Sequence, residues 1–238
     1  MRASLAVGRV EDEIRIGVDA LGMILYGTPL SSFSCKVRLA LAMKGCTVEE
    51  RMPPGGYRSA EYRQFIPSGR VPGLIDGEFA LGESDAIIEY IDETQSGPDL
   101  LPSSPQGRAR SRALSRFHDF YLDPPVRNLF PELDPRLRST ERVSQRVGEI
   151  VERLDMLETM IDPSPYLAGS SLSLADCAYP PSLILIEIIL PRLGYEAPLG
   201  PKLDRWWQAV RREPIFERTL GPYRAVANAW AASKLASP

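Results

Sequence analysis

The stretch of sequence that decides the fold is residues 23–45, MILYGTPLSSFSCKVRLALAMKG. It opens with four apolar residues at 23–26, which are typical of a short buried strand. A turn over 27–33 follows, and from Val37 onward apolar residues recur at helical spacing until Gly45 closes the helix. The stretch therefore predicts a strand, a serine-rich turn and a helix.

The elements that follow complete a small α/β unit. Residues 47–52 are expected to form a second strand and residues 59–65 a short helix, with a Pro-Pro-Gly-Gly loop between them. Residues 71–81 are expected to form two strands joined by an Asp-Gly turn, and residues 84–94 a helix. The order β-α-β-α-β-β-α predicts an α/β domain over residues 23–103.

The rest of the chain predicts helices and no strand. Residues 96–106 are rich in Ser, Pro and Gly, and we expect them to link two domains. Beyond this linker, apolar periodicity predicts helices at 108–122, 139–161 and 174–189, and a terminal helical region at 203–234 with breaks near Pro214 and Pro222. We therefore expect an all-α domain over residues 107–238.

Composition and charge exclude several classes of function. The chain has 238 residues and a formal net charge of -3, which gives no electrostatic reason to bind nucleic acid or an anionic membrane. Its three cysteines, Cys35, Cys46 and Cys177, are too widely spaced for a zinc knuckle or a dithiol redox pair. Cys35 is expected to be packed, and Cys46 and Cys177 are expected to be core or surface thiols. The longest apolar run, 183–190, is too short to span a bilayer. Residues 1–22 lack a secretory signal, so we expect a flexible extension and a cytoplasmic protein.

Four short motifs stand in order along the chain. They are SSFSCKVRLAL at 31–41, SGRVPGL at 68–74, GESDAIIEYI at 82–91, and YLAG followed by SLAD within 166–176. Together they resemble the motifs of the glutathione S-transferase family, and the resemblance covers roughly residues 23–230. The first motif is similar to the active-site signature of the serine-type zeta class.

The resemblance implies a fold, a co-substrate and an assembly. The expected fold is a thioredoxin-like N-terminal domain that binds glutathione, followed by a helical C-terminal domain. Glutathione would be a co-substrate, no metal would be needed, and the protein would be a homodimer with a role in detoxification. Ser173 and Asp176 in the last motif would form a capping box, which is a folding device and not a ligand site.

Ser31 and Ser32 are the catalytic candidates that the resemblance implies. A serine hydroxyl in the turn before a helix can donate a hydrogen bond to the glutathione thiolate, and the helix N-terminus favours negative charge there. Serines before helices also commonly cap them, so capping is the alternative for both. The sequence leaves open which serine contacts the sulfur.

Five further residues are expected to bind glutathione. The resemblance implies a cis bond between Val71 and Pro72, which would let the Val71 backbone pair with the cysteinyl part, with Arg70 beside it. Ser84, at a helix start, would hold the γ-glutamyl carboxylate, while Glu83 would face its ammonium group. An ordinary turn proline and a capping serine beside a solvated glutamate are the alternatives.

The second-substrate pocket is expected between the domains. The candidates to line it are Phe33, His118, Tyr121, Pro124, Pro125 and Arg127. A structural role is the alternative for His118, and a salt bridge is the alternative for Arg127, which could otherwise attract a carboxylate.

Three functions compete at this point. Phe33 stands where the zeta signature has a cysteine, which favours transfer of glutathione to a small hydrophobic or halogenated electrophile. The alternatives are glutathione-dependent cis-trans isomerisation of maleylacetoacetate or maleylpyruvate, and a non-catalytic binding or scaffold protein of this fold. A glutaredoxin-like reductase would need a cysteine at the start of the active-site turn, where Ser31 stands.

Overall fold

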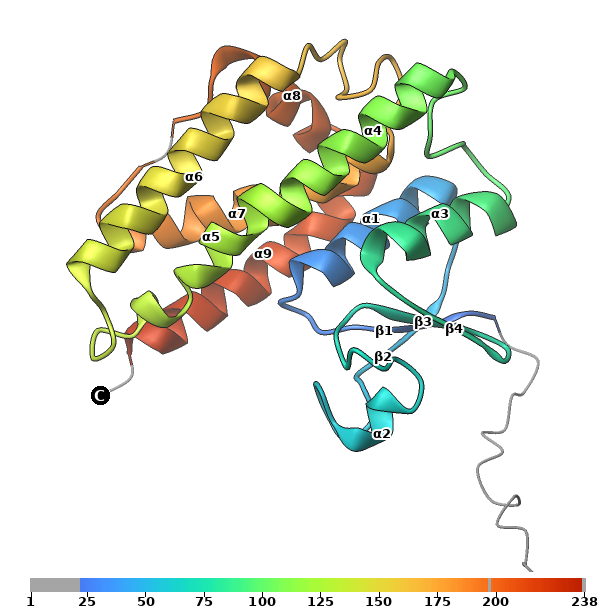
Figure 1. Ribbon diagram of the computed structural model, residues 1–238, viewed down its shortest axis with the longest axis horizontal. Helices are drawn as coiled ribbons and strands as arrows, with labels where there is room; N and C mark the ends of the chain where they lie inside the picture. Colours follow the sequence, from blue (N-terminus) through green and yellow to red (C-terminus); the bar gives the residue numbers. More distant parts are fainter. Residues whose placement is uncertain (1–21, 197, 237–238) are drawn as a thin grey trace, which may run out of the picture.

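The computed structural model describes residues 22–196 and 198–236 (Figure 1). The extension expected at residues 1–22 lies outside this range except for Gly22. Within the described residues, a four-stranded sheet with its helices is followed by a set of packed helices, which is the predicted combination of an α/β domain and an all-α domain. Figure 1 shows the sheet at one end of the molecule and the helical domain beside it.

The sheet has the strand order β2-β1-β3-β4. β1 pairs in parallel with β2 and antiparallel with β3, and β3 and β4 form a hairpin. The strands are β1 (Ile24–Tyr26), β2 (Glu49–Arg51), β3 (Gly73–Asp76) and β4 (Phe79–Gly82). In Figure 1, helices α1 (Ser32–Lys44) and α3 (Ser84–Thr94) cover one face of the sheet, and the short α2 (Ala60–Arg63) lies on the other.

The strand register brings three segments of the chain to one edge of the sheet. Tyr26, the last residue of β1, lies opposite Gly73, the first residue of β3, and Gly73 lies opposite Gly82, the last residue of β4. The loop after β1, the segment before β3 and the start of α3 after β4 therefore lie side by side. These are the segments that hold the first three sequence motifs.

The helical domain begins with α4 and ends with α9. Its elements are α4 (Pro105–Phe117), the π-helical turn η1 (His118–Leu122), α5 (Asp123–Asn128), the 3-10 turn η2 (Pro131–Leu133), α6 (Thr140–Met160), α7 (Leu174–Arg192), α8 (Pro201–Arg211) and α9 (Pro214–Leu235). The Ser173–Asp176 capping box at the start of α7 is confirmed. Asp176 also accepts hydrogen bonds from the Leu167 backbone and the Trp206 indole, and its complete burial raises the pKa of its carboxyl.

Two of the predicted helix boundaries are wrong. The helix expected at 108–122 is divided: α4 ends at Phe117, η1 follows, and α5 begins at Asp123. Pro124 and Pro125 stand in the first turn of α5, where a helix tolerates proline. The break expected near Pro222 is absent, since α9 runs through it. Pro222 is exposed, and the buried side of α9 holds the helix against α1 and α7. The break at Pro214 is confirmed.

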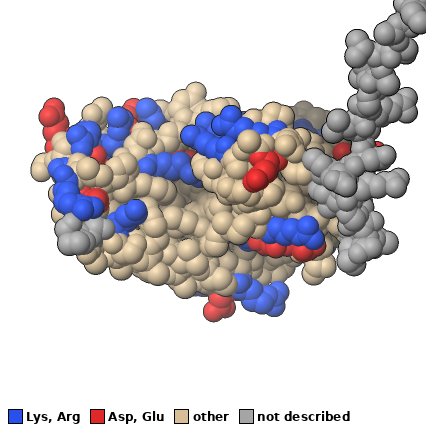
Figure 2. Space-filling view, turned by 90° about the horizontal axis from the view of Figure 1, so that it is seen from below, with Lys and Arg blue, Asp and Glu red and all other residues tan. Residues whose placement is uncertain are grey.

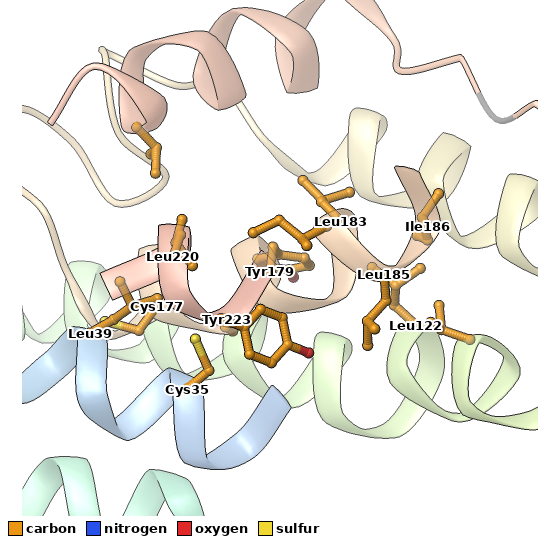
Figure 3. Packing of buried hydrophobic residues seen from close by; sticks show 14 of the residues in the cluster. Cys35, Leu39, Leu122, Cys177, Tyr179, Leu183, Leu185, Ile186, Leu220 and Tyr223 are labelled. Carbon is orange, nitrogen blue, oxygen red and sulfur yellow. The ribbon is translucent and has the colours of Figure 1, made fainter. Parts of the chain in front are cut away.

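Helix α1 belongs to the cores of both domains. It packs on α3 above the sheet and on α7 and α9 of the helical domain. In Figure 3, Cys35 and Leu39 of α1 face Cys177 of α7, with Leu220 and Tyr223 of α9 beside them. The position of α1, and of the serines at its start, is therefore fixed by both domains.

Helix α7 is the central helix of the second domain. It is the one described helix whose length and composition would allow it to cross a membrane, and most of its apolar stretch is buried inside the protein. Its proline pair, Pro180 and Pro181, lies in this buried stretch. Burial explains the apolar composition of α7, so that composition does not indicate a span.

Candidate active site

Ser31 ends the loop after β1 and caps helix α1. Its backbone is extended, and its Oγ accepts a hydrogen bond from the Ser34 backbone N–H at 3.1 Å. Only one lone pair of the hydroxyl oxygen is used in this bond, so the hydroxyl proton can still be donated elsewhere. The two roles considered for Ser31, capping the helix and donating to a thiolate, are therefore compatible in one conformation.

Ser32 is turned into the protein. Its hydroxyl donates to Asp123 Oδ1 at 2.9 Å and accepts from Arg127 Nη2 at 2.8 Å. The side chain is buried, and its proton is committed to the carboxylate. The two neighbouring serines thus face different surroundings, and the hydroxyl of Ser31 is the one with a free proton.

A cleft of about 540 Å³ opens at Ser31. One wall comes from the first domain and the other from the start of η1, from α5 and from the segment just after α5. Its lining residues are Thr28, Leu30, Ser31, Phe33, Tyr57, Arg58, Arg70, Val71, Asp119, Asp123, Pro124, Arg127, Asn128 and Phe130. Figure 2, seen from below relative to Figure 1, shows a hollow in this face of the molecule, with lysine and arginine side chains beside it.

The Val71–Pro72 bond is cis, as the resemblance implies. The loop before it is held by Tyr62, whose hydroxyl donates to the Arg70 carbonyl oxygen at 3.0 Å. Gly73 is required behind this loop, because a Cβ there would lie 2.4 Å from the Tyr62 hydroxyl. Val71 and Arg70 line the cleft on the side of the first domain.

Glu83 and Ser84 lie at the same sheet edge but do not line the cleft itself. Glu83 has a φ of 67°, a left-handed conformation that is strained for a residue with a side chain. No side chain caps the start of α3, and Ser84 is buried there. The geometry leaves the first backbone N–H groups of α3 free of a side-chain acceptor, which suits an anionic group.

The other wall contains a buried network that the sequence analysis missed. Lys36, fully buried in α1, forms ion pairs with Asp85 of α3 and with Asp119 of η1, the latter at 3.0 Å. Burial would raise the pKa of Asp119, but the hydrogen bond with His118 and the charge of Lys36 bring it below its usual value. Ser115 donates to Asp85 at 2.8 Å. The network fastens the first domain to the second.

His118 and Tyr121 lie outside the cleft. His118 is completely buried, with Nδ1 2.8 Å from Asp119 and Nε2 2.8 Å from Ser182. Tyr121 is exposed and stacks on Phe117. Of the six candidates for the second-substrate pocket, the cleft brings together three, namely Phe33, Pro124 and Arg127.

The cysteines are packed rather than reactive in the described structure. Burial raises the pKa of the Cys35 thiol to about 12, and Cys177 is also fully buried with a raised pKa. Cys35 lies one turn beyond Ser31 but points into the interdomain core (Figure 3). Neither of these buried thiols is therefore available as a nucleophile at the cleft.

A thioredoxin-like domain with a cis-proline loop, joined to a helical domain across a cleft, is the architecture of the glutathione transferases. Two family models match the chain: the glutathione S-transferase N-terminal domain over residues 25–99 and the C-terminal domain over residues 120–214. The chain belongs to the glutathione S-transferase family.

The relatives include enzymes with different names. A probable maleylacetoacetate isomerase of Vibrio cholerae is 40% identical over 82% of this chain and 94% of its own. Glutathione S-transferase 3 of Zea mays is 28% identical over 82% of this chain and 92% of its own. A solved maleylacetoacetate isomerase from Methylobacterium extorquens, with malonate and glutathione bound, is 27% identical with a TM-score of 0.69, covering 84% of this chain and 97% of its own.

Proposed function

We propose that this protein is a glutathione transferase in which Ser31 stabilises the glutathione thiolate. The observation that carries the proposal is the geometry of Ser31, which lines the cleft and whose hydroxyl accepts the helix-cap hydrogen bond while donating to none of the described residues. The N-terminal end of α1 adds a favourable field for a negative sulfur. The thiolate would attack an electrophilic carbon, form a carbon–sulfur bond and expel a leaving group such as chloride, with the thiol proton passing to solvent.

The remaining glutathione contacts are proposed from the sheet edge. The backbone of Val71 before cis-Pro72 would pair with the cysteinyl part of glutathione, and Arg70 would lie near its glycine carboxylate. Ser84 and the free N–H groups at the start of α3 would hold the γ-glutamyl carboxylate, with Glu83 facing the ammonium group. The three segments carrying these groups are adjacent by strand register.

The second candidate function is a zeta-type isomerase of a maleyl diacid. The 40% identity to a probable maleylacetoacetate isomerase favours it, and so does the solved isomerase that holds glutathione. Phe33, whose ring lines the cleft where the zeta signature has a cysteine, favours conjugation. We place conjugation of a small hydrophobic or halogenated electrophile first. The homodimer expected from the family is part of the proposal, and sizing of the purified protein tests it.

The test is the near-ultraviolet absorbance of the bound glutathione thiolate as a function of pH. We expect thiolate near neutral pH in the natural protein and its loss in Ser31→Ala, with glutathione binding retained by calorimetry. Failure of the natural protein to bind glutathione would instead support the scaffold alternative. Turnover of maleylacetoacetate at a rate above that of chlorodinitrobenzene conjugation would place the isomerase first.

A further inference from the structure

The helical wall of the cleft carries three charged side chains, and each is already paired. Asp119 is held by Lys36 and His118, as described above. Asp123 and Arg127 pair with each other one turn apart on α5, through Arg127 Nε and Asp123 Oδ2. This wall therefore offers a bound substrate no uncompensated positive charge among the described residues.

Arg127 is held in place on three sides. Nε donates to Asp123, Nη2 donates to Ser32 Oγ at 2.8 Å, and the guanidinium carbon lies 4.9 Å from the centre of the Phe33 ring. A guanidinium fixed by a carboxylate and a hydroxyl has little freedom to turn toward a substrate carboxylate. The salt-bridge alternative for Arg127 is the arrangement that the structure has.

Asp123 is fixed more firmly than its partner. Its side chain is 3% exposed against 39% for Arg127, and its Oδ1 accepts from Ser32 and from Ser182 Oγ at 3.3 Å. Ser182 comes from the central helix α7 and also contacts His118 Nε2. A carboxylate held from α1 and α7 in this way keeps its charge at a constant position beside Arg127.

We propose that Asp123 is a specificity-determining residue that directs this cleft toward uncharged electrophiles. By neutralising Arg127, it removes the cation that would attract a substrate carboxylate, and it leaves Phe33, Pro124 and Phe130 as the apolar surface for the electrophile. The inference rests on the proposed glutathione transferase function.

Two other arginines line the cleft, but on the opposite wall. Arg58 and Arg70 are exposed, and Arg58 lies against the Tyr57 ring at 5.1 Å. Solvent screens charges of this kind strongly. They lie on the side where glutathione, with its own carboxylates, is proposed to bind, so they do not replace Arg127 as a partner for the electrophile.

The test uses two electrophiles that differ in one charge, a chlorodinitrobenzoate and the matching chlorodinitrobenzamide. Each is conjugated to glutathione with release of chloride, and each enzymatic kcat/KM is divided by the uncatalysed rate constant in the same buffer. We expect the natural protein to favour the neutral amide by at least tenfold. The ratio is measured in one preparation, so it does not depend on the fraction of folded protein.

Asp123→Asn and Arg127→Gln should move this ratio in opposite directions. Asp123→Asn leaves Arg127 without its counter-charge, so the preference for the amide should fall about tenfold or reverse. Arg127→Gln leaves the Asp123 carboxylate without its counter-charge, so the preference for the neutral amide should grow. Glu149→Gln, which removes the acid of the Arg146–Glu149 pair on α6, is the matched control, with no change expected.

The outcomes separate this inference from the proposed function. A natural protein that conjugates both electrophiles but favours the benzoate overturns the role of Asp123, and so does an active Asp123→Asn with an unchanged ratio. If Asp123→Asn does not fold, the natural ratio and Arg127→Gln still decide. A natural protein that binds glutathione but conjugates neither electrophile overturns the proposed transferase function and this inference with it.

Discussion

The two walls of the cleft hold their polar groups by different means. On the wall of the first domain, Ser31, Val71 and the start of α3 are placed by backbone geometry: a helix cap, a cis peptide and a strand register. On the helical wall, Asp119, Asp123 and Arg127 are placed by side-chain contacts with residues far away in sequence. The polar groups of the first wall are the ones proposed to bind glutathione, and those of the second are bound to one another and to buried residues. Substitutions on the first wall should therefore change the chemistry of bound glutathione, and substitutions behind the second should change stability and selectivity.

The largest expected effect is on stability, from Lys36→Met. The change leaves the buried carboxylates of Asp85 and Asp119 without their shared cation, which costs roughly 3–5 kcal/mol for broken buried pairs. Urea unfolding should report a loss of this size. Arg146→Met, which breaks the half-exposed pair with Glu149, should cost less than about 1 kcal/mol. Equal losses in the two variants would mean that the buried network does not hold the domains together.

Next is the loss of catalysis in Ser31→Ala. Removing one hydrogen-bond donor from a developing or stabilised anion lowers rates by roughly a hundredfold or more, so kcat/KM for chlorodinitrobenzene should fall by about this factor. The lost cap should also cost about 1 kcal/mol of stability.

The matched control for Ser31→Ala is Ser104→Ala, which removes the side-chain cap of α4. The Ser104 hydroxyl oxygen accepts a comparable hydrogen bond from the Gly107 N–H at 3.0 Å. It should cost similar stability and leave kcat/KM unchanged. If kcat/KM falls in Ser104→Ala, or stays unchanged in Ser31→Ala, the assignment of the glutathione chemistry to the first wall is contradicted.

A smaller effect on activity is expected from Ser32→Ala. The hydroxyl lies between Asp123 and Arg127, so its loss should cost about 1.5–3 kcal/mol of stability, the range for hydrogen bonds to charged groups. Because its proton is committed to Asp123, kcat/KM should fall less than tenfold, and the thiolate titration should stay close to that of the natural protein. If Ser32→Ala abolished the thiolate while Ser31→Ala retained it, the assignment of the two serines would be reversed.

The smallest expected effect is on the stability of the protein at acidic pH. The pKa of Asp119 is lower in the folded protein than its ordinary value of 3.8, so this carboxylate contributes stability above about pH 4, and that contribution is lost as pH falls through the folded pKa. Asp119→Asn should therefore lessen the decrease in unfolding free energy below pH 4. The free energy of unfolding is measured in guanidinium at pH values between 5 and 3. If it depends on pH in the same way in Asp119→Asn and in the natural protein, Asp119 is not stabilised by Lys36 and His118.

Much of the first wall was predictable because its signals are local. The strand and helix of residues 23–45, the hairpin with Gly77 at its turn, and the capping position of Ser31 each depend on residues a few positions apart. The cis bond before Pro72 came from the family resemblance, since sequence alone favours trans. The predicted helix break at Pro222 is wrong, because tertiary packing of α9 outweighs the tendency of proline to end a helix.

The cleft brings together three of the six candidates for the second-substrate pocket, and the reason that it does not hold the others is physical. His118 and Tyr121 come from one helical stretch, but the π turn η1 and the packing of α7 send His118 into the core and leave Tyr121 on the surface. Asp123 is not among the residues that the sequence predicts for the site. The sequence offered one signal for it, the spacing of Asp123 and Arg127 at i and i+4 in a helix, which predicts a pair but not its location at the cleft.

The sequence by itself determined the order of the elements, the family and the presence of serines at the start of α1, because these depend on apolar periodicity, turns and caps within short windows. Only the tertiary structure decided which of two adjacent serines keeps a free proton. The partners that bind the Ser32 hydroxyl, Asp123 and Arg127, lie 91 and 95 residues further along the chain. Hydrogen bonds across that separation exist only after α1 has packed against both domains, so no local pattern encodes them.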